Sequence, residues 1–299
     1  TTGWGGRLAD LTNAFNTNNR ISMSITLNGQ NSFQVGKRIA QFAVNPGGAV
    51  ALSSSAGSST PAGIRTLAQN DLLAARNANL FEAAFSGITR NAIDDSALVS
   101  GILTANAPFT TAYPGTALGQ QLRTIARLIA SSKELGLKRQ IFFARIGGWD
   151  LHDDQVVAGN TGTGAHANLL SDVSKCLAAF YAATTGLGVA QSVTTFTASD
   201  FGRTFNTNGD GSDHGWGSHH MVMGGAVDGK KYWGQAPALS DNGDDTVGQG
   251  RLLPSTSVDE FAAALARWMG VAESDLSVVL PNIERFSNRT PLTLFKSTG

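Results

Sequence analysis

The sequence predicts an α/β fold with a mostly parallel sheet flanked by helices. Residues 139–146, with the apolar stretch Ile141–Ala144, are typical of a buried strand, and residues 192–197, rich in β-branched and aromatic side chains, are typical of a second strand. An amphipathic segment with helical spacing lies between them. This alternation of strand and helix is typical of parallel sheets joined by right-handed crossovers. The length of 299 residues fits one large domain, so residues 1–299 are interpreted as a single unit.

The first predicted elements are short strands. Residues 21–27 alternate apolar and polar side chains with the two-residue period of a strand, and Asn28-Gly29 is typical of a hairpin turn. We therefore expect residues 20–44 to form a small N-terminal β excursion on the sheet. A loop rich in glycine and serine is expected over residues 45–60.

The following elements are predicted helices. Residues 64–104 carry an apolar stripe, which we interpret as ordinary core packing rather than a partner-binding face. Shorter helices are expected over residues 118–129 and 169–181, and after a capping box at Ser257–Glu260. The stripe of the first segment comprises Leu67, Leu72, Leu73, Leu80, Phe81, Phe85 and Ile88, and the last helix buries Phe261, Leu265, Trp268 and Met269.

Composition limits the partners of the protein. The chain has 22 basic and 22 acidic residues and no basic run, so neither nucleic acid nor an anionic membrane surface is expected to bind it. No apolar run is long enough to span a bilayer. Charged residues make up only 15%, which favours a periplasmic or extracellular location, and an export signal would then have been removed. The single cysteine, Cys176, has apolar helical neighbours and is predicted to be a buried structural thiol.

Histidine and acidic residues gather beside the predicted strands of the second half. Ligand groups of α/β sheets collect at the carboxyl ends of the strands, so we expect these residues to converge. Imidazole with carboxylate suits zinc, manganese or iron, and we interpret the set as a zinc or manganese site. Any one of these residues alone would more often cap a helix or satisfy a turn; the clustering favours a metal. The candidate ligands are Asp150, His152, Asp213, His214, His219 and His220.

Residues 206–211 resemble part of a calcium loop. Their asparagine and aspartate oxygens alternate and are followed by glycine, but Gly217 stands where the loop would need a bidentate glutamate. Calcium is therefore kept as a further candidate metal, and a loop beside the site is the favoured interpretation.

Four separated motifs resemble the bacterial exported family known as domain of unknown function 1501. They are Gly147–His152, Ser199–Thr204, Asp213–His220 and Gly250–Thr256. The opening segment Gly3–Asp10 is similar to an internal part of the family, so the resemblance spans nearly the whole chain. Asp200 departs from the family, in which glutamate is more common at this position.

The resemblance implies an alkaline phosphatase-like or sulfatase-like fold and a metal-dependent hydrolase of phosphate or sulfate esters. It implies that Asp150 and His152 bind one metal, completed by His219 or His220. Asp213 and His214 would bind a second metal. Asp200 and Arg203 would be catalytic residues at the rim, with Arg203 clamping an anionic oxyanion through its planar guanidinium.

The resemblance also implies a chain that is N-terminally incomplete, because family members carry a further segment before Gly3–Asp10. The expected partners are a small anionic ester and an N-terminal fragment of the same precursor. Two classes of function remain open: the hydrolase, and a secreted binding or structural protein that keeps the fold without catalysis.

Overall fold

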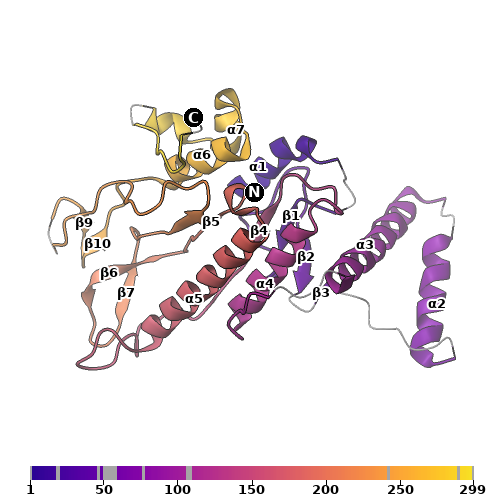
Figure 1. The fold of residues 1–299 in the computed structure, drawn as a ribbon, viewed down its shortest axis with the longest axis horizontal. Coiled ribbons are helices and arrows are strands. Elements are labelled where there is room, and N and C mark those ends of the chain that lie inside the picture. Colours follow the sequence, from indigo (N-terminus) through magenta and orange to yellow (C-terminus); the bar gives the residue numbers. More distant parts are fainter. Residues whose placement is uncertain are drawn as a thin grey trace.

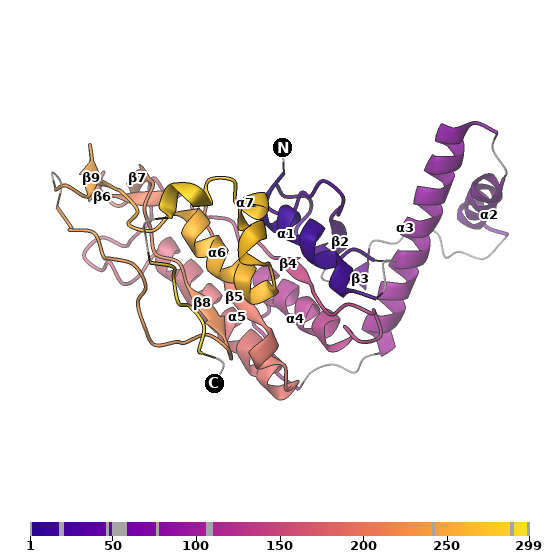
Figure 2. The same cartoon turned by 90° about the horizontal axis from the view of Figure 1, so that it is seen from above.

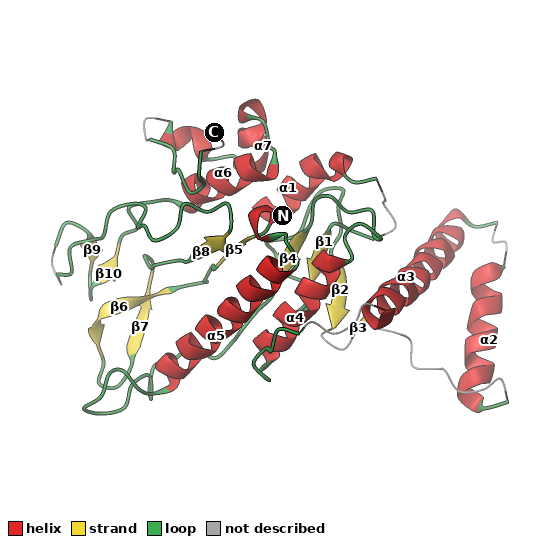
Figure 3. Ribbon diagram, in the orientation of Figure 1, coloured by secondary structure: helices red, strands yellow, loops and turns green. Residues whose placement is uncertain are grey.

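The computed structural model describes residues 2–17, 21–45, 48–49, 59–75, 78–105, 110–240, 243–287 and 290–297. In these residues the helices are α1 (Trp4–Thr12), α2 (Pro61–Ala74), α3 (Leu80–Ala105), α4 (Ala117–Ala130), α5 (Ala165–Gly186), α6 (Val258–Met269) and α7 (Leu276–Val279). The strands are β1 (Ser24–Thr26), β2 (Phe42–Asn45), β3 (Gly48–Ala49), β4 (Ile141–Phe143), β5 (Thr194–Phe196), β6 (Gly202–Thr207), β7 (Ser212–Gly215), β8 (Val222–Gly224), β9 (Thr246–Val247) and β10 (Arg251–Leu252). Figures 1 and 3 show this mixed α/β arrangement.

The main sheet has β1 at its centre. Its strand order is β3-β2-β1-β4, and β1 runs parallel to both β2 and β4. Every residue of β1 is fully buried, including Ser24 and Thr26. The amide of Gln34, also fully buried, donates hydrogen bonds to the carbonyls of Ile25 and Ile141, 3.1 and 3.0 Å away. Gln34 thus ties the two neighbouring strands together.

The prediction of a hairpin at Asn28-Gly29 is wrong. Gly29 adopts a left-handed conformation, as a turn requires, but the strands on either side of it pair in parallel. Residues 21–27 contain β1, an inner strand of the main sheet. The segment predicted as a small N-terminal β excursion is therefore part of the main sheet itself. The alternation of residue types suggested one exposed face, whereas helices cover both faces of this strand and bury its serine and threonine.

The mostly parallel sheet is not confirmed. Within the described parts of the chain, parallel pairing is confined to the three strands β2, β1 and β4. The predicted strand at residues 192–197 exists as β5, but it pairs antiparallel with β8 in a separate sheet of two strands. Two more antiparallel pairs, β6–β7 and β9–β10, lie at the same end of the molecule (Figures 1 and 2).

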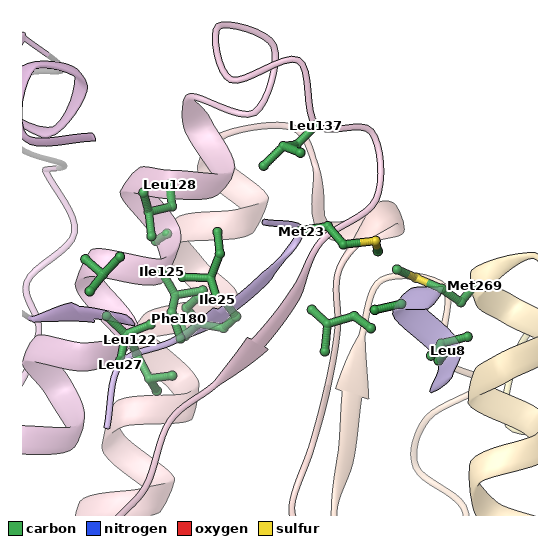
Figure 4. Packing of buried hydrophobic residues seen from close by; sticks show 14 of the residues in the cluster. Leu8, Met23, Ile25, Leu27, Leu122, Ile125, Leu128, Leu137, Phe180 and Met269 are labelled. Carbon is green, nitrogen blue, oxygen red and sulfur yellow. The ribbon is translucent and has the colours of Figure 1, made fainter. Parts of the chain in front are cut away.

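The hydrophobic core lies around the main sheet. Helices α4 and α5 pack together, as do α1, α6 and α7, and the strands β1 and β4 lie between these two groups (Figures 1 and 2). Figure 4 shows how side chains from β1, α1, α4, α5 and α6 fill this space. Its labelled members are Leu8, Met23, Ile25, Leu27, Leu122, Ile125, Leu128, Leu137, Phe180 and Met269.

The apolar stripe of residues 64–104 was expected to pack in the core. This expectation is wrong for α2 and for the first turns of α3. They project from the body of the molecule, as both views show (Figures 1 and 2). Leu67, Leu72, Leu80, Phe81, Phe85 and Ile88 are exposed by 50–86%, so this stripe is not part of the core. Helical periodicity predicts that a face is apolar, but it does not say whether the rest of the chain reaches that face.

Other local expectations are confirmed. Cys176 is buried, and burial raises the pKa of its thiol to about 11, so it is unreactive near neutral pH. The capping box of α6 is present, since the Ser257 hydroxyl accepts from the Glu260 amide and the Glu260 carboxylate accepts from the Ser257 amide. Among the described residues, none of the helices is both long and apolar enough to cross a bilayer.

Removing the cap should destabilise the fold. Ser257→Ala leaves the N-terminal amide of Glu260 without its acceptor, and the free energy of unfolding should fall by about 1 kcal/mol. Urea unfolding followed by circular dichroism measures this change. The control is Ser274→Ala, because the Ser274 hydroxyl is exposed and lies 3.5 Å from Asp275. Equal effects of the two substitutions would contradict the capping role.

Candidate metal site

The candidate site lies between a loop and an antiparallel hairpin. Asp150 and His152 lie in the segment that follows β4, whereas His214 is in β7. The sequence predicted that Asp150 and His152 follow one strand and that His214 precedes another strand of the same sheet, so that all three meet at one sheet edge. In the structure the histidine comes instead from the β6–β7 hairpin, which folds against the loop at residues 149–155.

Arg203 holds the hairpin in place. Its guanidinium donates one hydrogen bond to the Ser212 carbonyl, 2.5 Å away, and another to the carbonyl of Trp149. The first bond spans the hairpin and the second reaches the loop. Because Trp149 immediately precedes Asp150, this side chain links the hairpin to the loop next to the candidate ligands.

The tip of the hairpin adds three contacts to the loop. The Asp210 carboxylate accepts from the Asp154 amide at 3.1 Å, and the Ser212 hydroxyl donates to the Gln155 side chain at 2.7 Å. The Asn208 amide donates to the His152 carbonyl at 3.1 Å. Residues 206–211, considered above as a calcium loop, thus use two of their polar side chains to anchor the site.

Gly211 is required by a close approach of two backbones. A Cβ atom at this position would lie 1.9 Å from the carbonyl oxygen of His152, far inside van der Waals contact. Any larger residue would therefore push the hairpin away from the loop. The glycine is needed for space, next to a residue of the site.

Three side chains converge on one point. The Asp150 Oδ1 atom lies 2.7 Å from His214 Nε2 and 3.1 Å from His152 Nε2. One ligand atom from each residue lies within 4.8 Å of the others, and all three residues are exposed. Atoms bound to a tetrahedral zinc at about 2.0–2.2 Å are separated from each other by roughly 3.3–3.6 Å. The donor atoms are therefore close to the spacing that one metal ion requires.

The charge of Asp150 is stabilised by its neighbours. The hydrogen bond with His214 lowers the pKa of Asp150, and the nearby His152 and Arg203 act in the same direction. Because folding lowers this pKa, the interaction contributes stability above the pKa of the unfolded chain. That contribution is lost as the pH falls through the lower pKa of the folded state. At neutral pH the carboxylate is ionised, as a metal ligand must be.

Asp213 lies on the other side of His152. Its Oδ1 atom is 3.4 Å from His152 Nδ1, while Nε2 of the same ring faces Asp150. Histidine ligands of metals commonly present one ring nitrogen to the ion and the other to a carboxylate, which fixes the tautomer. This position fits an orienting role for Asp213 as well as the ligand role predicted for it.

Phe201 is part of the site, although it is not among the residues predicted from the sequence. Its ring stacks on His214 with centroids 3.8 Å apart, and the Arg203 guanidinium lies 5.1 Å from the Phe201 centroid. His214 in turn stacks on His152, at 4.9 Å. Phe201 immediately precedes β6, Arg203 follows two residues later within that strand, and Arg203 pairs with His214 across the hairpin. The two-residue period of a strand was the signal that could have identified it.

The remaining predicted residues lie outside this group. Asp200 is exposed at the bend before β6. His219 and His220 lie between β7 and β8, and His220 Nδ1 is 3.4 Å from the Thr197 hydroxyl. Burial is the main cause that lowers the pKa of His220, helped by His219. The structure thus brings together Asp150, His152, Asp213 and His214, with Arg203 beside them.

Comparison with known proteins gives one family. Residues 66–278 match the family model DUF1501, described as a protein of unknown function. The match covers the loop and the hairpin that form the site. Comparisons with curated proteins and with solved structures gave no match.

A substitution at Gly211 should separate the two halves of the site. Gly211→Ala is expected to displace the hairpin, so the pKa of Asp150 should rise toward its ordinary value as the bond with His214 is lost. Nuclear magnetic resonance titration of the Asp150 carboxyl carbon measures this. Gly147→Ala is the control, since its added methyl meets no atom within 4 Å. An unchanged Asp150 pKa in Gly211→Ala would show that the close approach does not position the site.

Proposed function

Because the chain belongs to the DUF1501 family of proteins of unknown function, we propose a function from the chemistry of its site. We propose a metal-dependent hydrolase of phosphate or sulfate esters in which Asp150, His152 and His214 hold one divalent ion. The observation that carries the proposal is the convergence of two imidazole Nε2 atoms on one carboxylate oxygen, at 3.1 and 2.7 Å.

The donor set favours zinc or manganese. Two imidazoles and a carboxylate suit zinc, manganese or iron, whereas calcium and magnesium prefer shells of oxygen ligands. Catalytic zinc sites typically have three protein ligands and leave a further position for water or substrate. The side chains of Asp150, His152 and His214 are 66%, 48% and 43% exposed, so a small molecule can reach the place where they meet.

Each residue around the three ligands has a role in this proposal. A bound divalent ion would polarise the ester oxygen and activate water at neutral pH. Asp213 would hold the Nδ1 proton of His152, leaving Nε2 free to act as a ligand. Phe201 fixes the plane of His214 by stacking. Arg203 keeps the loop on the hairpin, and its charge beside the site would favour an anionic ester.

The proposal has one metal where the family resemblance implied two. Asp150, His152 and His214 form a single group, although the resemblance divided them between two ions. His220 would complete a metal only after moving from its position beside Thr197, and His219 is likewise outside the group of three ligands. Asp200 stays a candidate rim residue for proton transfer to or from the ester.

A binding protein without catalysis is the second candidate, because two hydroxyls that lie near the site in the sequence are hydrogen-bonded rather than free to act as nucleophiles. The Ser199 hydroxyl donates to the Phe201 carbonyl at 2.9 Å, and the Thr204 hydroxyl donates to the Asn206 carbonyl at 2.9 Å. These hydroxyls flank the site in the sequence, but both are engaged by backbone in this structure. Hydrolysis would therefore depend on metal-activated water rather than on either side chain as a nucleophile.

Metal titration tests the ligand set. Calorimetry with Zn²⁺ or Mn²⁺ should give about one ion per chain, and Asp150→Asn or His214→Ala should lower the affinity at least tenfold. The tenfold effect is the lower end expected even for residues that only orient ligands. Asp153→Asn is the matched control, an exposed aspartate of the same loop that is outside the group. Equal losses in Asp153→Asn would indicate nonspecific binding to surface carboxylates.

Chelation should destabilise the folded protein if the site binds metal only when folded. A metal present at a hundredfold excess over its Kd adds about 2.7 kcal/mol to the free energy of unfolding. A chelator should then lower the Tm of the metal-loaded protein, and His152→Ala should remove this response. A chelator response of wild-type size in His152→Ala would place the metal elsewhere in the chain.

Hydrolysis of aryl phosphate and aryl sulfate esters separates the two candidate functions. The hydrolase should turn over one of these classes in the presence of Zn²⁺ or Mn²⁺, with the rate lost in His152→Ala. A chain that binds one ion with Asp150 and His214 but hydrolyses neither class supports the binding protein. A chain that binds no metal would contradict the hydrolase and leave the binding or structural protein.

A further inference from the structure

Helices α2 and α3 present a large apolar surface to solvent. Seven large apolar residues on these two helices are between 50% and 86% exposed: Ile64, Leu67, Leu72, Leu80, Phe81, Phe85 and Ile88. Phe81, Phe85 and Ile88 are spaced by four and three residues, so they form one stripe along α3. Surfaces of this kind on soluble proteins mark interaction sites.

The two helices are poorly supported by the rest of the chain. Helix α2 has 14 residues, and Gly63 is its one buried residue. Among the described residues, the buried positions of α3 lie in its C-terminal part, at Ser96, Val99 and Leu103. A helix as short as α2 is marginal in water and draws its stability from burial of an apolar face. Neither α2 nor the first turns of α3 obtains that burial from the described chain.

We propose that α2 and α3 form a homodimer interface with the same helices of a second copy of the chain. The exposed area argues for this occupant. From the exposed fractions above, the seven side chains together expose roughly 900 Å², taking about 150–250 Å² for an aromatic residue and somewhat less for an aliphatic one. A standard protein interface buries about 800 Å² on each partner, so a second copy that covered these side chains would form an interface of ordinary size.

The geometry suits a twofold pairing. A two-helix projection that meets its own copy gives four helices around one apolar centre, which is a common arrangement of helices. A twofold interface needs a single surface that is complementary to itself, and an apolar stripe meets this requirement. The projection also stands clear of the body of the molecule, so a second copy can approach it (Figures 1 and 2).

Charge disfavours a membrane as the occupant. Helices that lie on anionic membranes carry lysine and arginine on their polar face. Within α2 and α3 there are four acidic residues and two arginines: Asp71, Glu82, Asp94, Asp95, Arg65 and Arg90. A surface with charges of both signs and an acidic excess would not be drawn to anionic lipid, whereas opposite charges at its margins can pair between two copies.

Sedimentation velocity of the full chain over a wide range of concentration tests the proposal. The chain of 31.1 kDa should sediment as a dimer of twice this mass at high concentration. Phe81→Asp and Leu72→Glu should each raise the dimer Kd by at least about 30-fold, the effect of losing a central hot-spot residue. Tyr232→Asp and Leu239→Glu are matched controls, because these residues are 98% and 68% exposed outside the two helices. Both controls should remain dimeric.

Hydrogen exchange gives a second measurement that does not depend on the variants. Amides in residues 61–74 and 80–88 should exchange more slowly at high protein concentration than at low concentration. A wild-type chain that stays monomeric at all concentrations would overturn the proposal, as would a dimer that Phe81→Asp leaves intact. Flotation of the wild-type chain, but not of Phe81→Asp, with vesicles of neutral or anionic lipid would assign the surface to a membrane and equally overturn it.

Discussion

The candidate site depends on the attachment of the β6–β7 hairpin to the loop that follows β4. Arg203 contributes to this attachment next to the ligands, because its guanidinium donates both to Ser212 within the hairpin and to Trp149 in the loop. Burial lowers the pKa of Arg203, and the charges of Asp150 and Asp213 oppose that shift; an arginine guanidinium stays charged in proteins, so the site has a positive charge beside its carboxylates. One residue therefore serves the geometry and the electrostatics of the site together.

Ring stacking and contacts with neighbouring groups, rather than burial, hold the side chains of the site in place. The ligands are exposed, yet the rings of Phe201, His214 and His152 stack in sequence, and the Asp213 carboxylate lies beside the outer nitrogen of His152. Stacking and backbone contacts restrict the side chains without removing them from solvent. An accessible site with preset ligands suits a small charged ligand, since less conformational entropy is lost when the ligand binds.

The candidate metal site and the apolar surface of α2 and α3 lie at opposite ends of the molecule. The hairpin with the candidate site lies at one end, and α2 with α3 projects at the other, with the core around β1 between them (Figure 1). A dimer formed through the projecting helices would leave the site open. Cys176 and Gln34, both fully buried, belong to the rigid middle of the molecule, which connects the two ends without contributing to either surface.

The sequence by itself determined the local elements and the chemical character of the site. Helical spacing located α4, α5 and α6, the capping box fixed the start of α6, and the clustering of histidine with aspartate indicated a metal site. These signals are local, because helix formation and capping depend on residues within a few positions of each other.

Only the tertiary structure decided how these elements pair and which groups meet. Alternation in residues 21–27 could not show that both faces of β1 are covered, nor could the strand at β5 show that its partner is β8 in the antiparallel sense. His214 meets Asp150 because Gly211 allows two backbones to touch and Arg203 reaches Trp149, 54 positions away. The stripe on α2 and α3 is exposed because no other described element reaches it. Such contacts depend on the whole chain folding back on itself, and residue spacing does not encode that.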